Sequence, residues 1–549
     1  MIKALATGVL LSFCWPAMGG MVPLVFFAWV PLLLAEERFA ISERSERPRH
    51  FMPYVLLAVA VWNACTTWWL YCVSEPMESK LFSVIGPNIG NDLLFCVPWL
   101  VMRWARWFLP GRYVRWVLVV AWIAFERFHM NWDLSWPWLT LGNVFAEHPA
   151  WVQWYEFTGH LGGSLWVWLV NLGVAAVILN KGARESGQRK GVMAALLIAV
   201  PFGASEIRYA TFKDAGVPLE IVIVQPNIDP YNVKFASDPL VQLDGMLAQA
   251  EPLITPRTVL VVMPETALQE LPRLADGPNG DLLLQGLWEN DLGASQSVHR
   301  IRAFLSKHPG TSLVCGMSSA YLYPEGAHLP VTARVIESLG RGFDAYNAAL
   351  LVRPDGTTES YMKSKLVPGV ELLPFEEWLG PISSIALDLG GTTGSLGTQE
   401  EREVLSTQQG HVKFAPVICY ESIYGDHVAA HVRNGAQFIT IMTNDAWWSD
   451  SPAYRQHLAF GRLRAVETRR SIARSANTGI SCFIDQRGEL SEVTDWWVPA
   501  ARKGIVLARA DLTFFARFGD LIGATCQWLC GVWLIVMVIL LFRRRMTRT

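Results

Sequence analysis

The apolar residues of this chain concentrate in two regions, before about residue 205 and after about residue 520. A stretch of about 20 predominantly apolar residues is long enough to cross a bilayer as a helix. Residues 4–35 carry no charge, but the PAMGG segment at 16–20 predicts two shorter helices joined by a tight turn. Further spans are predicted at 52–73, 81–102, about 113–126, 161–180, about 191–205 and 521–542. The pattern therefore predicts eight transmembrane helices, the last of them near the C-terminus.

Two carboxylates interrupt these predicted spans, Asp92 in the fourth and Glu126 at the end of the fifth. A charged group at membrane depth is costly, so each of them needs a polar partner or access to water. They indicate either a polar cavity or substrate path, or else a helix-packing hydrogen bond or an interfacial position, and the pattern leaves both interpretations open.

Basic residues alternate between the two sides of the predicted spans. The 36–50, 103–115 and 181–190 connections each hold four Lys or Arg, and the tail after 542 is basic. The 74–80 and 127–160 connections hold only one Lys and one Arg between them. Because basic connections stay in the cytoplasm, this alternation places both termini there and residues 206–520 on the opposite side. We expect a transmembrane domain at 1–205, an external domain at 206–520, and a final helix with a cytoplasmic tail at 521–549.

Between residues 206 and 520 the pattern changes to short apolar runs separated by polar or helical segments. Near-continuous apolar runs of this length are typical of strands that are covered on both faces. A helix is predicted after them, because Ala459, Leu463 and Val466 share one face. The pattern therefore predicts a layered α/β domain with helices on the faces of its sheets. The predicted strands are 220–225, 258–263, 312–317, 346–352, 414–420 and 438–443.

Composition agrees with a membrane protein and excludes some classes of function. Hydrophobic residues make up 52% of the 549 residues and charged residues 17%, with 25 Trp. A net charge of -2 gives no reason to expect a nucleic acid partner. The nine Cys form no CxxC pair and no Cys/His ligand spacing, so neither a structural zinc site nor a disulfide framework is expected.

Three residue types that act together in thiol chemistry occur at or near predicted strand ends. Glu265 follows TVLVVM, Cys419 ends FAPVIC, and Lys363 follows the strand at 346–352 and a predicted turn. A carboxylate can accept the proton of a thiol, while an ammonium can stabilise the thiolate and a tetrahedral oxyanion. Taken singly, each residue is more often structural, as a buried Cys, a Glu at a helix start and a solvated surface Lys.

The segments around these residues resemble known motifs. VVMPETAL (261–268), YMKSKLVPGVE (361–371) and VICYES (417–422) resemble, in order, the three catalytic motifs of the nitrilase superfamily. Within that superfamily the chain is similar to the bacterial apolipoprotein N-acyltransferase family. Other segments that carry the resemblance are 8–37, 124–143, 223–228, 443–448 and 456–481.

The resemblance implies a role for each motif residue. Glu265 is the implied general base, Cys419 the nucleophile, and Lys363 the oxyanion stabiliser together with the backbone N–H of Tyr420. It also implies supporting positions, which are Glu371, Tyr420, Glu421 and, as an aromatic residue near a lipid entrance, Phe235.

The implied fold is an αββα nitrilase-like sandwich that faces the periplasm from a multi-pass bacterial inner-membrane protein. The implied reaction transfers a fatty acyl chain from a membrane phospholipid, through a cysteine thioester, to the N-terminal amine of diacylglyceryl-cysteine in an apolipoprotein. This chemistry needs no metal and no cofactor, and a monomer is sufficient for it.

Two segments depart from the family pattern or carry weaker signals. Lys365 stands where many members of the family have His. It either lowers the pKa of Lys363 or binds a phosphate, or it is an exposed lysine without a role. The segment DLLLQGLWEN (281–290) is interpreted either as a lid that dips into the membrane over the acyl chain or as a helix that covers the core.

Two other functions are compatible with the same sequence. A membrane-anchored amide hydrolase of the superfamily would use water in place of the amine, although anchoring alone needs only one span. A membrane scaffold or transporter with an inactive nitrilase-like domain is a further alternative, against which the intact Glu265, Lys363 and Cys419 argue.

Overall fold

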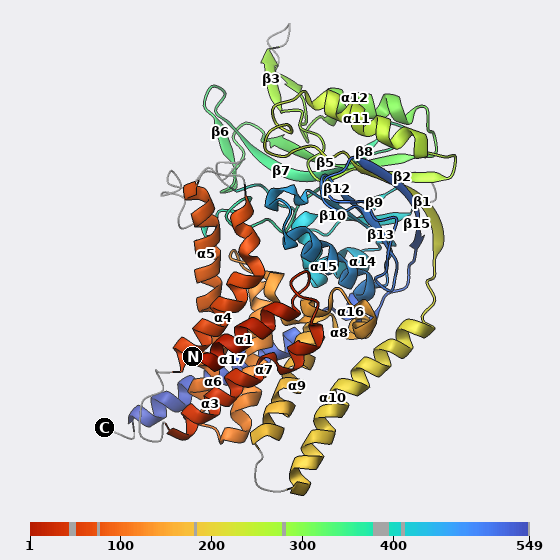
Figure 1. The fold of residues 1–549 in the computed structure, drawn as a ribbon. Helices are drawn as coiled ribbons and strands as arrows, with labels where there is room; N and C mark the ends of the chain where they lie inside the picture. The colour runs from red at the N-terminus through yellow and green to blue at the C-terminus, as the bar shows by residue number, and fades with distance from the viewer. Residues whose placement is uncertain are drawn as a thin grey trace. The chain divides into compact units, whose positions relative to one another are not determined.

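The structure is a computed structural model that describes residues 1–42, 51–73, 77–179, 184–276, 282–376, 395–407 and 412–546. The chain divides into two compact units, shown in Figure 1. One unit is helical and comprises 1–72, 80–212 and 518–549, and the other is an α/β unit that comprises 73–79 and 213–517. Parts of two predicted basic connections, at 43–50 and 180–183, lie outside the described residues.

The helical unit follows the predicted apolar runs. The predicted interruption at 16–20 is present, because the first helix ends at Cys14 and both Ala17 and Gly20 have positive φ. The main helices are α1 (Ile2–Cys14), α2 (Val25–Ala28), α3 (Val30–Ser42), α4 (Met52–Thr67), α5 (Met77–Phe95), α6 (Val97–Ala105), α7 (Gly111–His129), α9 (His160–Leu179), α10 (Arg184–Thr211) and α17 (Leu521–Met546).

Among the described residues, five helical segments are long and apolar enough to cross a membrane. They are Met52–Cys72, Val84–Ala105, His160–Leu179, Gly187–Thr211 and Leu521–Arg543. The first helix, α1, is apolar but shorter. Of the remaining predicted spans, the second falls on α2 and the first part of α3. The fifth falls on α7, which carries Arg, Glu and His side chains among its apolar residues. The chain is therefore a multi-pass membrane protein, and the number eight stays a prediction.

The two carboxylates in the predicted spans both have hydrogen-bond partners within the helical unit. Asp92 accepts a hydrogen bond from Asn63 of α4 at 3.1 Å. Glu126 accepts from the indole of Trp122 at 2.9 Å and from the backbone N–H of Leu141 at 2.8 Å. These contacts favour the helix-packing interpretation of both residues.

The α/β unit contains two sheets. The seven-stranded sheet has the order β15-β1-β2-β5-β7-β6, with β8 also paired to β7, and the six-stranded sheet has the order β14-β13-β12-β11-β10-β9. The first sheet is built from β1 (Val217–Gln225), β2 (Thr258–Val262), β5 (Ser312–Leu322), β6 (Arg334–Ile336), β7 (Arg341–Val352), β8 (Thr358–Met362) and β15 (Ala500–Ala508). The second is built from β9 (Leu405–Ser406), β10 (Lys413–Ile418), β11 (Phe438–Thr443), β12 (Ile472–Ala476), β13 (Cys482–Ile484) and β14 (Leu490–Ser491).

Alternating strand residues place the two sheets face to face with helices outside. Ile221 and Ile223 point into the core shared with the second sheet, where they join Phe414. Val222 and Val224 point outward, under α11 (Pro239–Ala250) and α12 (Gln296–Leu305). The outer face of the second sheet is covered by α14 (Gly425–Arg433) and α15 (Pro452–Thr468). The predicted αββα sandwich is therefore confirmed, and Figure 1 shows its layers.

The prediction of a helix within 281–290 is wrong. Residues 282–285 form β4 (Leu282–Gln285), which pairs with β3 (Arg273–Asp276) in a two-stranded sheet. A short apolar run fits a strand as well as a helix, and here cross-strand pairing decides the outcome. Leu287 and Trp288 are buried in the α/β unit, so these two side chains do not form a membrane-dipping surface. Asp281 lies outside the described residues.

Candidate active site

Cys419 lies at the sharp turn that follows β10. It begins a short 3-10 helix, Cys419–Ile423, and has a φ of 47°, a left-handed conformation that is strained for a residue other than glycine. Its carbonyl oxygen accepts a hydrogen bond from the Ser422 hydroxyl at 2.7 Å and lies 3.1 Å from Nε2 of His457. These contacts hold the backbone of the strained turn.

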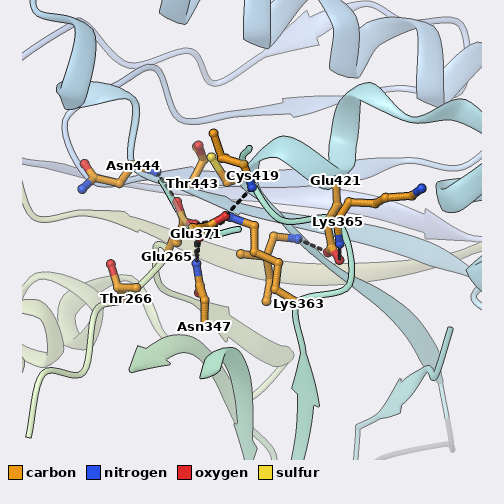
Figure 2. A network of polar contacts seen from close by, with 12 residues as sticks. Glu265, Thr266, Asn347, Lys363, Lys365, Glu371, Cys419, Glu421, Thr443 and Asn444 are labelled. Carbon is orange, nitrogen blue, oxygen red and sulfur yellow. Dashed lines mark hydrogen bonds and ion pairs between the residues drawn. The ribbon is translucent and has the colours of Figure 1, made fainter. Parts of the chain in front are cut away.

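Glu265 follows β2 in the other sheet and points to the same place. One carboxylate oxygen, Oε2, accepts from the backbone N–H of Asn444, directly after β11, at 3.1 Å. The other, Oε1, accepts from the side chains of Asn347 at 2.8 Å and Lys363 at 3.0 Å. Strand ends from both sheets therefore meet at this carboxylate, as Figure 2 shows.

Lys363 follows β8 and lies between two carboxylates. Its Nζ is 3.0 Å from Oε1 of Glu265 and 2.9 Å from Oε1 of Glu371, and the side chain is 1% exposed. Burial alone would lower the pKa of Lys363, but the charges of these two carboxylates outweigh it and hold the pKa well above its usual value. The net effect is thus the opposite of the lowered pKa that one interpretation of Lys365 gives, and Lys363 is cationic.

The protonation states of Glu265 and Cys419 are set by the same surroundings. Burial would raise the pKa of Glu265, yet Lys363 and the Asn347 amide lower it below its usual value, so Glu265 is ionised. Burial, with the negative charge of Glu265, raises the pKa of Cys419. The resting site therefore pairs a neutral thiol with a carboxylate that can accept its proton.

Of the supporting residues that the resemblance implies, Glu371 and Tyr420 lie in the interior around the site, whereas Phe235 lies at the surface. Glu371 accepts from Asn347 at 2.9 Å and, through its second oxygen, from the backbone N–H of Val367 at 2.9 Å, in addition to its contact with Lys363. Tyr420 is buried beside Tyr424, with ring centroids 5.3 Å apart. Phe235, in contrast, is 62% exposed.

Glu421 connects the segment of Cys419 to that of Lys363. Its carboxylate accepts from the backbone N–H of Ile418 at 2.8 Å and from that of Ser364 at 2.7 Å. Tyr361 of β8 donates to it as well, at 2.8 Å. Because these donors flank the two motif residues, Glu421 fixes the two segments relative to one another.

Lys365 is not the exposed lysine that one interpretation of the sequence describes. Its side chain is half-buried, and its ammonium lies over the Tyr424 ring, 5.0 Å from the ring centroid. Burial and the neighbouring Arg402 lower the pKa of Lys365. This contact is a cation–π interaction on the ring that packs against Tyr420.

Three polar residues of this site were not predicted from the sequence. Asn347 interrupts an apolar run in β7, which is a usable signal for a buried functional amide. Lys234 is only 3% exposed, and its ammonium donates to the hydroxyl of Thr266, the residue after Glu265. Neither Lys234 nor Thr266 belongs to a recognisable motif. No group of metal-binding side chains is assembled anywhere in the described ranges.

Comparison with known proteins connects both units to characterised families. The carbon-nitrogen hydrolase family matches residues 223–513, and the apolipoprotein N-acyltransferase N-terminal domain matches residues 7–173. The chain is 29% identical to an apolipoprotein N-acyltransferase of Chlorobaculum tepidum, over 97% of this chain and 96% of the relative. It is 25% identical to one of Geobacter metallireducens, over 99% and 95%.

Solved structures also resemble the chain in part. Nit3 of Saccharomyces cerevisiae, a member of branch 10 of the nitrilase superfamily, covers 58% of this chain and 96% of its own, with 15% identity and a TM-score of 0.36. An amidase from Nesterenkonia sp. covers 55% and 93%, with 16% identity and a TM-score of 0.35.

Proposed function

This chain belongs to the carbon-nitrogen hydrolase family and, within it, to the apolipoprotein N-acyltransferases, and from this premise we propose how its site performs acyl transfer. The donor is a membrane phospholipid, the carrier is a thioester on Cys419, and the acceptor is the N-terminal amine of diacylglyceryl-cysteine in an apolipoprotein. The observation that carries the proposal is the buried contact of Glu265 with Lys363, because the charges of both residues act on the Cys419 thiol.

The first half-reaction forms the thioester. Glu265 accepts the thiol proton, and the Cys419 thiolate attacks the ester carbonyl of the phospholipid. Lys363 and the backbone N–H of Tyr420 stabilise the oxyanion of the tetrahedral intermediate. The intermediate collapses by breaking the bond to the glycerol oxygen. That oxygen takes the proton from Glu265, and a lysophospholipid leaves.

The second half-reaction releases the acyl chain. The neutral amine of the acceptor attacks the thioester carbonyl and forms a second oxyanion at the same donors. Glu265 accepts a proton from the attacking nitrogen, and the carbon–sulfur bond then breaks. The departing Cys419 thiolate takes the proton from Glu265, which restores the resting site and yields the amide product.

The helices of the first unit support a lipid substrate over the two alternatives. A soluble amide needs no multi-pass membrane unit, and an inactive scaffold needs no buried carboxylate–ammonium pair. The full-length similarity to apolipoprotein N-acyltransferases has the same implication. We further propose that both termini are cytoplasmic, that the α/β unit is periplasmic, and that the monomer is active.

Intact-protein mass spectrometry tests the proposal. Purified protein is incubated with one defined phospholipid in the absence of acceptor. A mass gain of one acyl chain is expected, mapped to Cys419 and removed by neutral hydroxylamine. Cys419→Ala should gain no mass, whereas Cys65→Ser, at an exposed cysteine of the helical unit, should behave like wild type. Transfer of the acyl chain from Cys419 to a diacylglyceryl-cysteinyl peptide then completes the test. If the protein binds the phospholipid but forms no adduct, the proposal is contradicted.

A further inference from the structure

Lys234 lies in the segment between β1 and α11, and the fold holds it firmly in place. Its backbone N–H donates to the carbonyl of Asp229 at 2.9 Å, and its own carbonyl accepts from the side chain of Gln242, in α11, at 2.8 Å. The side chain is buried, whereas the next residue, Phe235, is exposed. The sequence neighbour of the predicted lipid-entrance residue is therefore directed into the protein.

The ammonium of Lys234 reaches the turn that carries Glu265. It donates to the Thr266 hydroxyl and lies 3.4 Å from the backbone carbonyl oxygen of Glu265. Thr266 has a φ of 47°, so this turn is strained and needs external support. Both of these acceptors are neutral, although burying an ammonium is costly unless a negative charge compensates it.

The active site supplies the negative charge that compensates the buried ammonium of Lys234. Lys363 is shared by Glu265 and Glu371, so a single ammonium faces two carboxylates. The nearby Asp445 is already paired with Arg474, at 2.5 Å. A second positive charge is needed for a neutral cluster, and Lys234 supplies it.

We propose that Lys234 is a positioning residue that holds the Glu265 turn through Thr266. Its positive charge, the second in the cluster, also lowers the free energy of the Cys419 thiolate and of the oxyanion that follows it in this buried site. This inference deepens the proposed function and rests on it. When Glu265 takes the thiol proton, one negative charge moves from its carboxylate to sulfur. With Lys234 cationic, the cluster of Glu265, Glu371, Lys363 and Lys234 and the Cys419 sulfur stays neutral before and after this step.

The titration of Lys234 is consistent with this role and gives a pH signature. Burial lowers the pKa of Lys234 to about 8, while the charges of Glu265 and Cys419 oppose that decrease. The helix packed on this segment, α11, contributes the neutral Gln242. Lys234 is therefore cationic below about pH 8 and loses its charge above that value. Conversely, the charge of Lys234 lowers the pKa of Glu265.

Alkylation of Cys419 by iodoacetamide measures its nucleophilicity without any acyl donor. The second-order rate, read by mass spectrometry of the Cys419 peptide in the full chain, is compared for wild type, Lys234→Met and Lys234→Arg. An increase of about one unit in the thiol pKa makes Lys234→Met about tenfold slower at pH 7.5. Lys234→Arg keeps the charge and should stay within about threefold of wild type. The matched control is Lys307→Met, at a lysine just after α12 whose side chain is 67% exposed.

Two further measurements separate charge from packing. The acidic limb of the acyl-transfer pH profile should move to higher pH in Lys234→Met, because the pKa of Glu265 rises. Thr266→Val, which removes the hydroxyl acceptor, should lower kcat with little change in KM, and it tests the contact even where Lys234→Met fails to fold.

An alkylation rate in Lys234→Met within twofold of wild type would overturn the inference, and so would an equal loss in Lys234→Arg. Alkylation needs no lipid, so the two ideas can fail separately. If Lys234→Met slows the alkylation of Cys419 as expected but no acyl adduct forms on Cys419 with phospholipid, the result counts against the proposed function and not against the role of Lys234.

Discussion

At the scale of single residues, Asn347 is the clearest functional position outside the motifs. Its amide donates to both Glu265 and Glu371, and it is among the groups that lower the pKa of Glu265. Asn347→Leu keeps the size but removes these donors. A buried hydrogen bond to a charged group contributes about 1.5–3 kcal/mol, so kcat should fall by about 10- to 100-fold. Steady-state acyl transfer measures this, with Asn434→Ala at an exposed asparagine as the control. An unchanged kcat would show that Asn347 does not support the base.

Glu421 predicts a residue-scale dependence of stability on pH. Burial would raise the pKa of Glu421, but His427 and the backbone N–H of Ser364 outweigh it and lower the pKa from 4.5 to about 2. Because the pKa of Glu421 is lower in the folded protein than in the unfolded chain, its ionised carboxylate stabilises the fold at pH values above 4.5. This contribution disappears as the pH falls from 4.5 towards 2. The shift corresponds to about 3 kcal/mol. Glu421→Gln should therefore be destabilised at pH 7 and approach wild type in acid.

Thermal unfolding in detergent between pH 7 and pH 3 measures this effect. Glu325→Gln, at an exposed glutamate, should follow wild type throughout the range. A destabilisation of Glu421→Gln that stays constant down to pH 3 would mean that packing, and not ionisation, makes Glu421 important.

The residues that could be predicted from the sequence are those that keep a fixed local context. Glu265, Lys363 and Cys419 each lie within a short motif, and the structure brings the first two into direct contact. Lys234 carries no such context, because its partner Thr266 is 32 positions away and only the folded sheet brings them together. A lysine in isolation resembles a solvated surface charge, so its burial could not be predicted.

At the scale of elements, strand β5 supports the turn that carries Glu265. The backbone N–H of Gly316 donates to the Pro264 carbonyl at 3.0 Å, and its carbonyl accepts from the N–H of Leu268 at 3.0 Å. A Cβ at Gly316 would lie 2.4 Å from the Thr266 nitrogen and 2.6 Å from Cα of Glu265. Backbone atoms cannot move aside cheaply, so Gly316→Ala should displace Glu265.

Gly316→Ala should lower kcat strongly and destabilise the α/β unit by about 1–3 kcal/mol, as over-packing does. The matched control is Gly461→Ala in α15, where the nearest atom to a new Cβ is the Ile441 Cδ1 at 3.5 Å, an ordinary contact. Activity and thermal unfolding are measured on both variants. Equal behaviour of the two would contradict the assignment of Gly316 as support for the Glu265 turn.

The elements themselves were predicted where length and composition separate a strand from a helix. Strands β2 and β11 are short runs rich in β-branched residues, a composition that favours strands over helices. Helix α15 has 17 residues, which is too long for a typical strand. The β3–β4 hairpin could not be predicted, because LLLQ in β4 is too short to distinguish a strand from a helix. Its structure depends on pairing with Arg273–Asp276, a contact that no local pattern encodes.

At the scale of the whole molecule, orientation in the membrane remains a prediction that the basic connections support. The last apolar helix, Leu521–Arg543, is followed by a tail that contains Arg544, Arg545 and Arg548. If this helix spans the bilayer, the chain before it and the tail after it lie on opposite sides. Alkaline phosphatase is active only outside the cytoplasm, so a fusion at Lys213, after α10, should be active and a fusion after Thr549 should be inactive. Green fluorescent protein at Thr549 should fluoresce. Active phosphatase at Thr549 would reverse the orientation, and activity at both positions would mean that α17 does not cross the membrane.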